Sequence, residues 1–188
     1  MLKLTNGVLP AVERAVELGI ADPALLFVLG HSYGGYGVYG LVTQTNRFHA
    51  AVALAGSCDL ISLYGSLDAW YRYDDFPHEQ LFQATLLETG QGRMGSPPWK
   101  DAGRYLLNSP IFFVDRVQTP LLIIHGDMDY SPIQQGEEFF MSLYRQGKRA
   151  AFVRYWGEGH VLESPANIRD MWRRILAWFE KASGARTG

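Results

Sequence analysis

One serine lies in a sequence setting that indicates chemistry. Ser32 is the centre of Gly30–Gly34 (GHSYG), which follows the apolar run Leu25–Leu29 and precedes a segment that can form a helix. A Gly-x-Ser-x-Gly turn between a strand and a helix lifts the serine hydroxyl off the sheet, as in a nucleophile elbow. The alternatives are a glycine-rich turn without chemistry and a phosphate-binding loop, but the latter needs a Lys followed by Ser or Thr. The pattern predicts that Ser32 is a nucleophile.

A serine nucleophile needs a histidine base, and one of the five histidines fits that role best. In this kind of sheet the catalytic residues follow one another along the chain as Ser, Asp or Glu, and His. His160 lies in the loop Gly157–His160, after a strand and after every candidate acid. The others lie inside the elbow, before a strand, in an irregular stretch, or ahead of the candidate acids: His31, His49, His78 and His125. We therefore expect His160 to be the base.

Two aspartates compete for the role of the acid that orients the base. Asp127 and Asp129 both follow an apolar strand. Asp129 lies further into the loop, where its side chain can turn toward His160, whereas Asp127 is placed to brace the turn. The residue types favour Asp129 and leave Asp127 open. The backbone N–H of Tyr33, next to the nucleophile, is expected to donate to the oxyanion.

Short apolar runs alternate with amphipathic segments along most of the chain. This alternation predicts a doubly wound, mainly parallel α/β sheet with helices on both faces. Such sheets carry their sites at the carboxyl ends of the strands, so the three candidate catalytic residues should meet at one edge. Strands are expected at 25–29, 50–55, 121–124 and 151–156, and helices at about 5–18, 33–45, after Ser131-Pro132 and after Ser164-Pro165.

The stretch at about 57–110 interrupts this alternation. It is rich in Tyr, Trp, Gly and Asp, and long excursions between core strands often cover or line a site. We expect one α/β domain over residues 1–188, with this excursion capping the site. Trp70, Tyr71 and Tyr73 are candidates for the wall of a substrate pocket. The alternative is a solvated insertion packed on the flank of the domain.

Composition excludes several other classes of function. The chain has 188 residues and a formal net charge of −2, so nothing indicates a nucleic acid or an anionic membrane as partner. No apolar run reaches membrane-spanning length, and the N-terminus does not resemble a secretion signal. The only cysteine is Cys58, without metal-type spacing, so no metal or other cofactor is expected. We expect a cytoplasmic protein.

Four segments together resemble the catalytic domain of the prolyl oligopeptidase family of serine peptidases, which has the α/β-hydrolase fold. They are Gly30–Tyr36, Ser109–Pro120, His125–Asp129 and Gly157–His160. The resemblance covers nearly the whole chain. It implies Ser32 as nucleophile, Asp129 as acid and His160 as base.

The chain departs from the family pattern at its start. Family members usually carry an upstream β-propeller and earlier hydrolase strands, one of which supplies the second oxyanion donor. An N-terminally truncated, open site favours small carboxylic esters, cleaved through an acyl-enzyme. Two alternatives stand beside the esterase: a peptidase fragment that needs its missing N-terminal half, and a non-catalytic remnant that binds or assembles through the cleft. The strand at 25–29 would have a bare edge, which we expect a second copy of the chain, a swapped segment or a separate fragment to cover.

Overall fold

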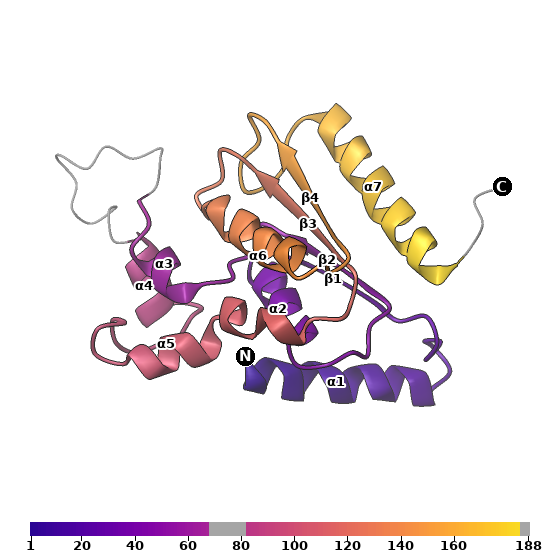
Figure 1. Cartoon of the computed structure of the whole chain (residues 1–188), viewed down its shortest axis with the longest axis horizontal. Coiled ribbons are helices and arrows are strands. Elements are labelled where there is room, and N and C mark those ends of the chain that lie inside the picture. The colour runs from indigo at the N-terminus through magenta and orange to yellow at the C-terminus, as the bar shows by residue number, and fades with distance from the viewer. Residues whose placement is uncertain (68–81, 185–188) are drawn as a thin grey trace.

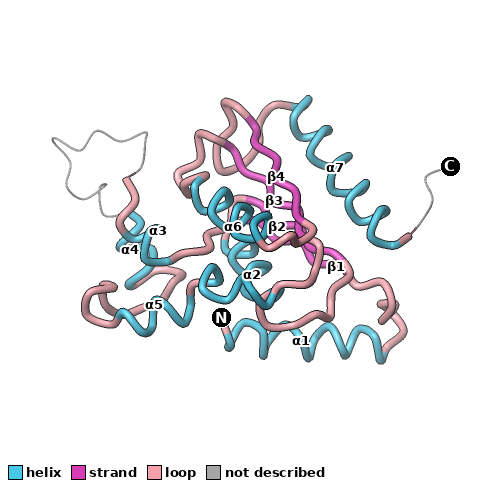
Figure 2. Tube along the Cα trace, in the orientation of Figure 1, coloured by secondary structure: helices cyan, strands magenta, loops and turns pink. Residues whose placement is uncertain are grey.

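A computed structural model describes residues 1–67 and 82–184, and a four-stranded parallel sheet lies at its centre (Figures 1 and 2). The strands are β1 (Phe27–His31), β2 (Ala50–Leu54), β3 (Leu121–Gly126) and β4 (Ala150–Tyr155), in the order β1-β2-β3-β4. Because all of them run parallel, their carboxyl ends meet at one edge of the sheet. The predicted candidates Ser32, Asp129 and His160 all follow these ends.

The two inner strands are continuous apolar runs because helices cover both of their faces. Every residue of β2 and β3 is buried. β1 differs from its prediction: it begins two residues later than expected, and its side chains alternate between half-buried and exposed. Leu29 is 42% exposed. Within the described part of the chain β1 pairs with β2 alone, so it is an edge strand.

Helices pack on both faces of the sheet, which confirms the doubly wound α/β fold. On one face, α2 (Tyr33–Val42) and α6 (Gln134–Arg145) pack Tyr39 and Phe139 against the strands. On the other face, α7 (Pro165–Ser183) buries Ile175 against alternate residues of β2 and β3. The two faces of each strand thus enter two separate apolar clusters, as the period of two in a strand requires.

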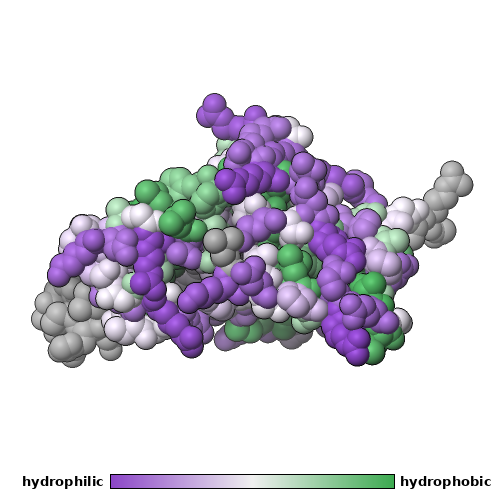
Figure 3. All heavy atoms as spheres, turned by 90° about the horizontal axis from the view of Figure 1, so that it is seen from below, coloured by the Kyte–Doolittle hydropathy of each residue, from purple (hydrophilic) through white to green (hydrophobic). Residues whose placement is uncertain are grey.

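α1 (Leu2–Glu17) lies outside this layer and packs against α2 and the start of β1. Its apolar side chains Val8, Val12 and Val16 contact a cluster that includes Leu26 and Leu41. Seen from below, the face on which α1 lies is covered mostly by hydrophilic side chains with small apolar patches between them (Figure 3). No described helix is both long enough and apolar enough to span a bilayer.

The excursion between β2 and β3 forms a small helical group that packs against α2 (Figure 1). It contains α3 (Leu60–Tyr64), α4 (Phe82–Glu88), α5 (Ala102–Asn108) and the 3-10 helix η2 (Pro110–Arg116). A buried cluster joins these helices to α2 through Tyr36: Leu60, Leu63, Leu87, Met94 and Tyr105. The pocket candidates Trp70, Tyr71 and Tyr73 lie outside the described residues.

Two helix starts differ in detail from the sequence expectation. α6 begins at Gln134, two residues after Pro132, and the Ser131 hydroxyl lies 3.3 Å from the Ser57 hydroxyl. α7 begins at Pro165 after Ser164 as predicted, although the Ser164 side chain makes no capping hydrogen bond. The backbone N–H groups of the two serines donate to nearby carboxylates, Ser131 to Asp129 and Ser164 to Glu158.

Candidate active site

Ser32 occupies the sharp turn between β1 and α2 in a strained backbone conformation. Its φ is 60° and its ψ is −119°, a region that non-glycine residues rarely adopt. A Cβ at Gly30 would overlap the carbonyl oxygen of Gly34, so the turn needs glycine there. At Gly34, the other glycine of the motif, a Cβ would meet no atom within 4 Å. The next glycine, Gly35, is the constrained one, because its Cβ would come within 2.5 Å of the Leu54 carbonyl oxygen.

The structure brings the three predicted catalytic side chains into one chain of hydrogen bonds. The Ser32 Oγ lies 2.8 Å from His160 Nε2, and His160 Nδ1 lies 2.8 Å from Asp129 Oδ1. The three residues follow β1, β4 and β3, so the parallel sheet gathers them across more than a hundred residues of sequence. An imidazole that donates Nδ1–H to the carboxylate presents Nε2 as the acceptor for a serine proton.

The Asp129 carboxylate is fully enclosed and lies between two imidazoles. Its Oδ1 also accepts from the N–H of Ser131 at 2.7 Å. Its Oδ2 lies 3.2 Å from Nε2 of His125, which donates to the Ser131 carbonyl at 2.8 Å. Burial would raise the pKa of Asp129, but its contacts with His125 and His160 outweigh that effect and hold the pKa below its usual value. The carboxylate therefore stays ionised where it contacts His160.

Sequence reasoning missed the part played by His125. It set His125 aside because this histidine precedes the candidate acids, yet the side chain is buried directly beneath Asp129. The available signal was an imidazole at the end of an apolar strand, four residues before the acid. A buried polar side chain at such a position needs a partner, and Asp129 and Ser131 are its neighbours.

Asp127 and Glu158 hold the two loops that carry Asp129 and His160. Asp127 Oδ1 accepts from the N–H of Gly157 at 2.6 Å, so Asp127 braces the turn as its position suggested. The Glu158 carboxylate accepts from the N–H groups of Glu163 and Ser164 at 2.7 and 3.2 Å, at the start of α7. The Asn167 side chain also donates to it, and these bonds lower the pKa of Glu158.

His160 is also held from its other sides. His31 Nε2 donates to the His160 carbonyl at 2.7 Å, and the Tyr130 ring lies 4.3 Å from the His160 ring, measured between centroids. Tyr33 is the first residue of α2, so its N–H has no acceptor within the helix. That N–H is placed beside Ser32, where the oxyanion donor was expected.

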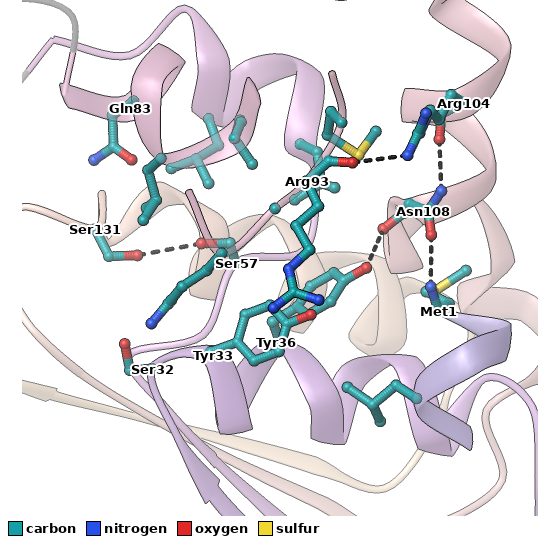
Figure 4. Close-up of a pocket in the computed structure, with 18 of the residues that line it drawn as sticks. Met1, Ser32, Tyr33, Tyr36, Ser57, Gln83, Arg93, Arg104, Asn108 and Ser131 are labelled. Atoms are coloured by element: carbon teal, nitrogen blue, oxygen red, sulfur yellow. Dashed lines mark hydrogen bonds between the residues drawn. The ribbon is translucent and has the colours of Figure 1, made fainter. Parts of the chain in front are cut away.

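A pocket of about 1060 Å³ opens from Ser32 and His160 toward the helices of the excursion (Figure 4). Tyr33 and Tyr36 of α2 line it, with ring centroids 5.5 Å apart. At the far end of the pocket, hydrogen bonds connect Asn108 of α5 to α2 and to the N-terminus. Tyr36 Oη donates to the Asn108 carbonyl, and the Met1 amine donates to Asn108 Oδ1 (Figure 4). The site therefore combines a polar relay with a large, partly apolar cavity, as a binding pocket requires.

Comparisons with known proteins agree with this arrangement. The chain is 32% identical over 181 residues to the uncharacterized peptidase YuxL of Bacillus subtilis, covering 94% of this chain and 25% of that protein. It is 29% identical to the acylamino-acid-releasing enzyme of Arabidopsis thaliana, covering 91% of this chain and 22% of the relative. The solved structure of a puromycin-hydrolyzing peptidase from Mycobacterium tuberculosis superposes with a TM-score of 0.80 at 27% identity, over 95% of this chain and 25% of that chain.

The chain thus spans about a quarter of the length of each of these proteins. The model of the prolyl oligopeptidase family matches residues 5–186, nearly the whole sequence. On that match, together with the fold, the chain belongs to the prolyl oligopeptidase family.

Proposed function

We propose that this chain carries the active site of a serine peptidase that works through an acyl-enzyme. The observation that carries the proposal is the hydrogen-bonded series Ser32–His160–Asp129, with 2.8 Å at each link. A serine in a strained elbow, an imidazole in reach and a buried carboxylate behind it are the groups that nucleophilic acyl transfer requires.

In the proposed reaction, Ser32 Oγ attacks the scissile carbonyl while His160 Nε2 takes the hydroxyl proton. Asp129 holds the Nδ1–H tautomer and stabilises the imidazolium that forms. The Tyr33 N–H donates to the developing oxyanion at the start of α2. His160 then gives its proton to the leaving amine, which leaves an ester between Ser32 and the acyl group. Water, activated by His160, hydrolyses that ester and restores the serine.

The substrate class follows from the family rather than from the three side chains. The relatives named above are peptidases or release acylated amino acids, which supports peptides over the small esters that the sequence analysis favoured. The chain spans about a quarter of the relatives' length, so the activity and substrates of a whole protein of this family are part of the proposal.

Turnover of matched amides and esters tests the proposal. The 188-residue chain is assayed with N-acyl-dipeptide p-nitroanilides and with p-nitrophenyl esters of the same acyl groups, beside Ser32→Ala and the control Ser142→Ala. We expect hydrolysis of both classes by the wild type and Ser142→Ala, and none above background by Ser32→Ala. Hydrolysis of esters alone would favour the esterase. Absence of any turnover by folded protein would favour the non-catalytic remnant.

The unpaired side of β1 supports a second, structural proposal. Within the described chain this side has no neighbouring strand, and β1 has no Lys or Pro that would discourage pairing. We propose that a second copy of the chain or a swapped segment covers it.

A further inference from the structure

The charged side chains that line the pocket beyond the catalytic residues are all cationic. Lys3, Arg93, Arg104 and Arg116 line the same cavity as Ser32, and no Asp or Glu belongs to the described lining. The chain as a whole has a net charge of −2, so this concentration of positive charge is local to the pocket. A cavity lined with one sign of charge attracts ligands of the opposite sign.

The three arginines of the pocket have no carboxylate partner among the described residues. Some arginines outside the pocket form ion pairs with acids, such as Arg47 with Glu13 and Arg174 with Asp170. Arg93, Arg104 and Arg116 form no such pair with any residue that the structure describes. Their charges are therefore available to an anion that enters the pocket.

Contacts within the chain orient two of these arginines, Arg104 and Arg116. Arg104 Nη2 donates to the Arg93 carbonyl at 2.7 Å, which anchors the Arg104 side chain to the backbone at Arg93 (Figure 4). Arg93 has a φ of 49°, and its side chain extends from there into the pocket in the direction of Tyr33 and Tyr36 (Figure 4). The Arg116 guanidinium lies 4.7 Å from the centre of the Phe113 ring. Held guanidinium groups lose less conformational freedom when they bind a ligand.

We propose that this pocket binds a carboxylate of the peptide substrate, with Arg93 as the main specificity-determining residue. A guanidinium can hold a carboxylate through two parallel hydrogen bonds, and the apolar wall of the pocket strengthens that attraction. The carboxylate comes either from an Asp or Glu side chain near the scissile bond or from a free chain terminus. This inference rests on the proposed peptidase function and narrows its substrate class to peptides with a carboxylate close to the scissile bond.

Binding to an inactive chain separates this inference from catalysis. The probes are fluorescent peptides of one length that share a common parent sequence. In each peptide one position carries Glu, Gln or Lys, and the C-terminus is amidated. One further Gln peptide keeps its terminal carboxylate free. Anisotropy with Ser32→Ala protein gives the affinities, and the wild type gives kcat/KM for those peptides that are cleaved.

We expect the best Glu peptide, or the free-carboxylate peptide, to bind at least about tenfold more tightly than the amidated Gln peptide. Arg93→Gln in the Ser32→Ala background should remove that preference and leave the affinity for the Gln peptide within about twofold. Arg145→Gln, an exposed arginine on α6 outside the pocket, is the matched control. Added salt should weaken the preference in the wild type.

The inference would be overturned if neither the Glu peptides nor the free-carboxylate peptide bound more tightly than the amidated Gln peptide. A loss of affinity in Arg93→Gln that is the same for peptides with and without the carboxylate would also overturn it. Labelling of Ser32 by a fluorophosphonate tests the catalytic proposal separately. A chain that labels but shows no preference for carboxylates keeps its proposed function and loses this inference. A chain that binds acidic peptides selectively but does not label keeps the inference about the pocket and loses the peptidase.

Discussion

Single side chains of the candidate site are each held by several neighbours. Asp129 contacts His160, His125 and the N–H of Ser131, and His160 is held from both sides by His31 and Tyr130. A group held in this way loses little conformational freedom on reaction, which favours preorganised catalysis. Substitutions at Asp129 and at His125, the second histidine that contacts it, should therefore have measurable effects.

Asp129 should make the stability of the fold depend on pH. Its pKa is lower in the folded chain than in the unfolded chain, so the unfolded chain binds a proton first as the pH falls. The stability that Asp129 contributes is thus present near neutral pH and is lost as the pH falls through its folded pKa. In urea unfolding from neutral pH to about pH 3, Asp129→Asn should lose less free energy of unfolding than the wild type. Parallel pH curves for the two proteins would contradict this.

His125 should position Asp129 as well as support the fold. His125→Phe keeps a ring but leaves Asp129 Oδ2 and the Ser131 carbonyl without their neighbour Nε2. We expect a loss of about 1–3 kcal/mol in the free energy of unfolding. We also expect kcat to fall about 10- to 100-fold through misplacement of the relay, with KM little changed. His49→Gln, an exposed substitution, is the control, and a kcat equal to that of the wild type would refute the positioning role.

The three side chains of the relay could be predicted from sequence because motif and chain order restrict them strongly. Ser32 lies in a five-residue motif, and only His160 follows every candidate acid. The sequence alone left Asp127 open, because both aspartates follow the same strand. The hydrogen bond from Gly157 to Asp127 decides between their roles, and such a contact across loops is not visible in a one-dimensional pattern.

The candidate catalytic residues lie in loops that follow short strands, and side chains from neighbouring loops hold these loops through hydrogen bonds. Glu158 connects the loop after β4 to the start of α7. Its carboxylate accepts hydrogen bonds from the backbone N–H groups of Glu163 and Ser164, the two residues before that helix. A carboxylate there also interacts favourably with the positive end of the helix. Glu158 is only 5% exposed, so water cannot easily take its place as the acceptor of these hydrogen bonds.

Glu158→Gln should therefore loosen the loop that carries His160. The amide keeps the shape but loses the charge and one acceptor oxygen, which should lower the free energy of unfolding by about 1–2 kcal/mol. Urea unfolding measures this effect, and hydrogen exchange should be faster in the loop after β4. Glu163→Gln changes a neighbouring exposed carboxylate and should have no such effect. Equal losses in both variants would contradict the capping role.

Element types were predictable, whereas several ends were not. Buried runs such as β2 and β3 stand out because both of their faces are apolar. The bounds of β1 shifted by two residues, because an apolar run does not show where pairing with a neighbour begins. α6 begins two residues after Pro132, because the residues before it belong to the loop in which the N–H of Ser131 donates to Asp129, a contact set by the site rather than by the helix.

The sheet of the whole molecule has β1 as an edge strand, directly before Ser32. If a second copy or a swapped segment covers β1, the chain should sediment as an oligomer. Leu29→Lys places a charge on that edge and should shift the chain to monomer, because charged side chains discourage strand pairing. Leu176→Lys, on the exposed side of α7, should leave the oligomer intact. A wild type that stays monomeric at high concentration would refute the proposal.

The doubly wound fold could be predicted from alternating strands and helices, but the pocket could not. Its wall comes from α2, from the excursion and from loops far apart in the sequence. The arginines that line it look like ordinary surface charges until the fold brings them to one cavity. Their grouping is a property of the folded molecule, since no local pattern joins Arg93 to Arg116.

The most direct test of the account is the rate at which a fluorophosphonate phosphonylates this chain with loss of fluoride, with the modified residue identified by peptide mass. Wild-type protein should be modified on Ser32, and Ser32→Ala should not react. His160→Ala should react at least about a thousandfold more slowly while remaining folded, because the serine then has no base. Modification of another residue, or a His160→Ala protein that reacts as fast as the wild type, would contradict the central claim that His160 activates Ser32.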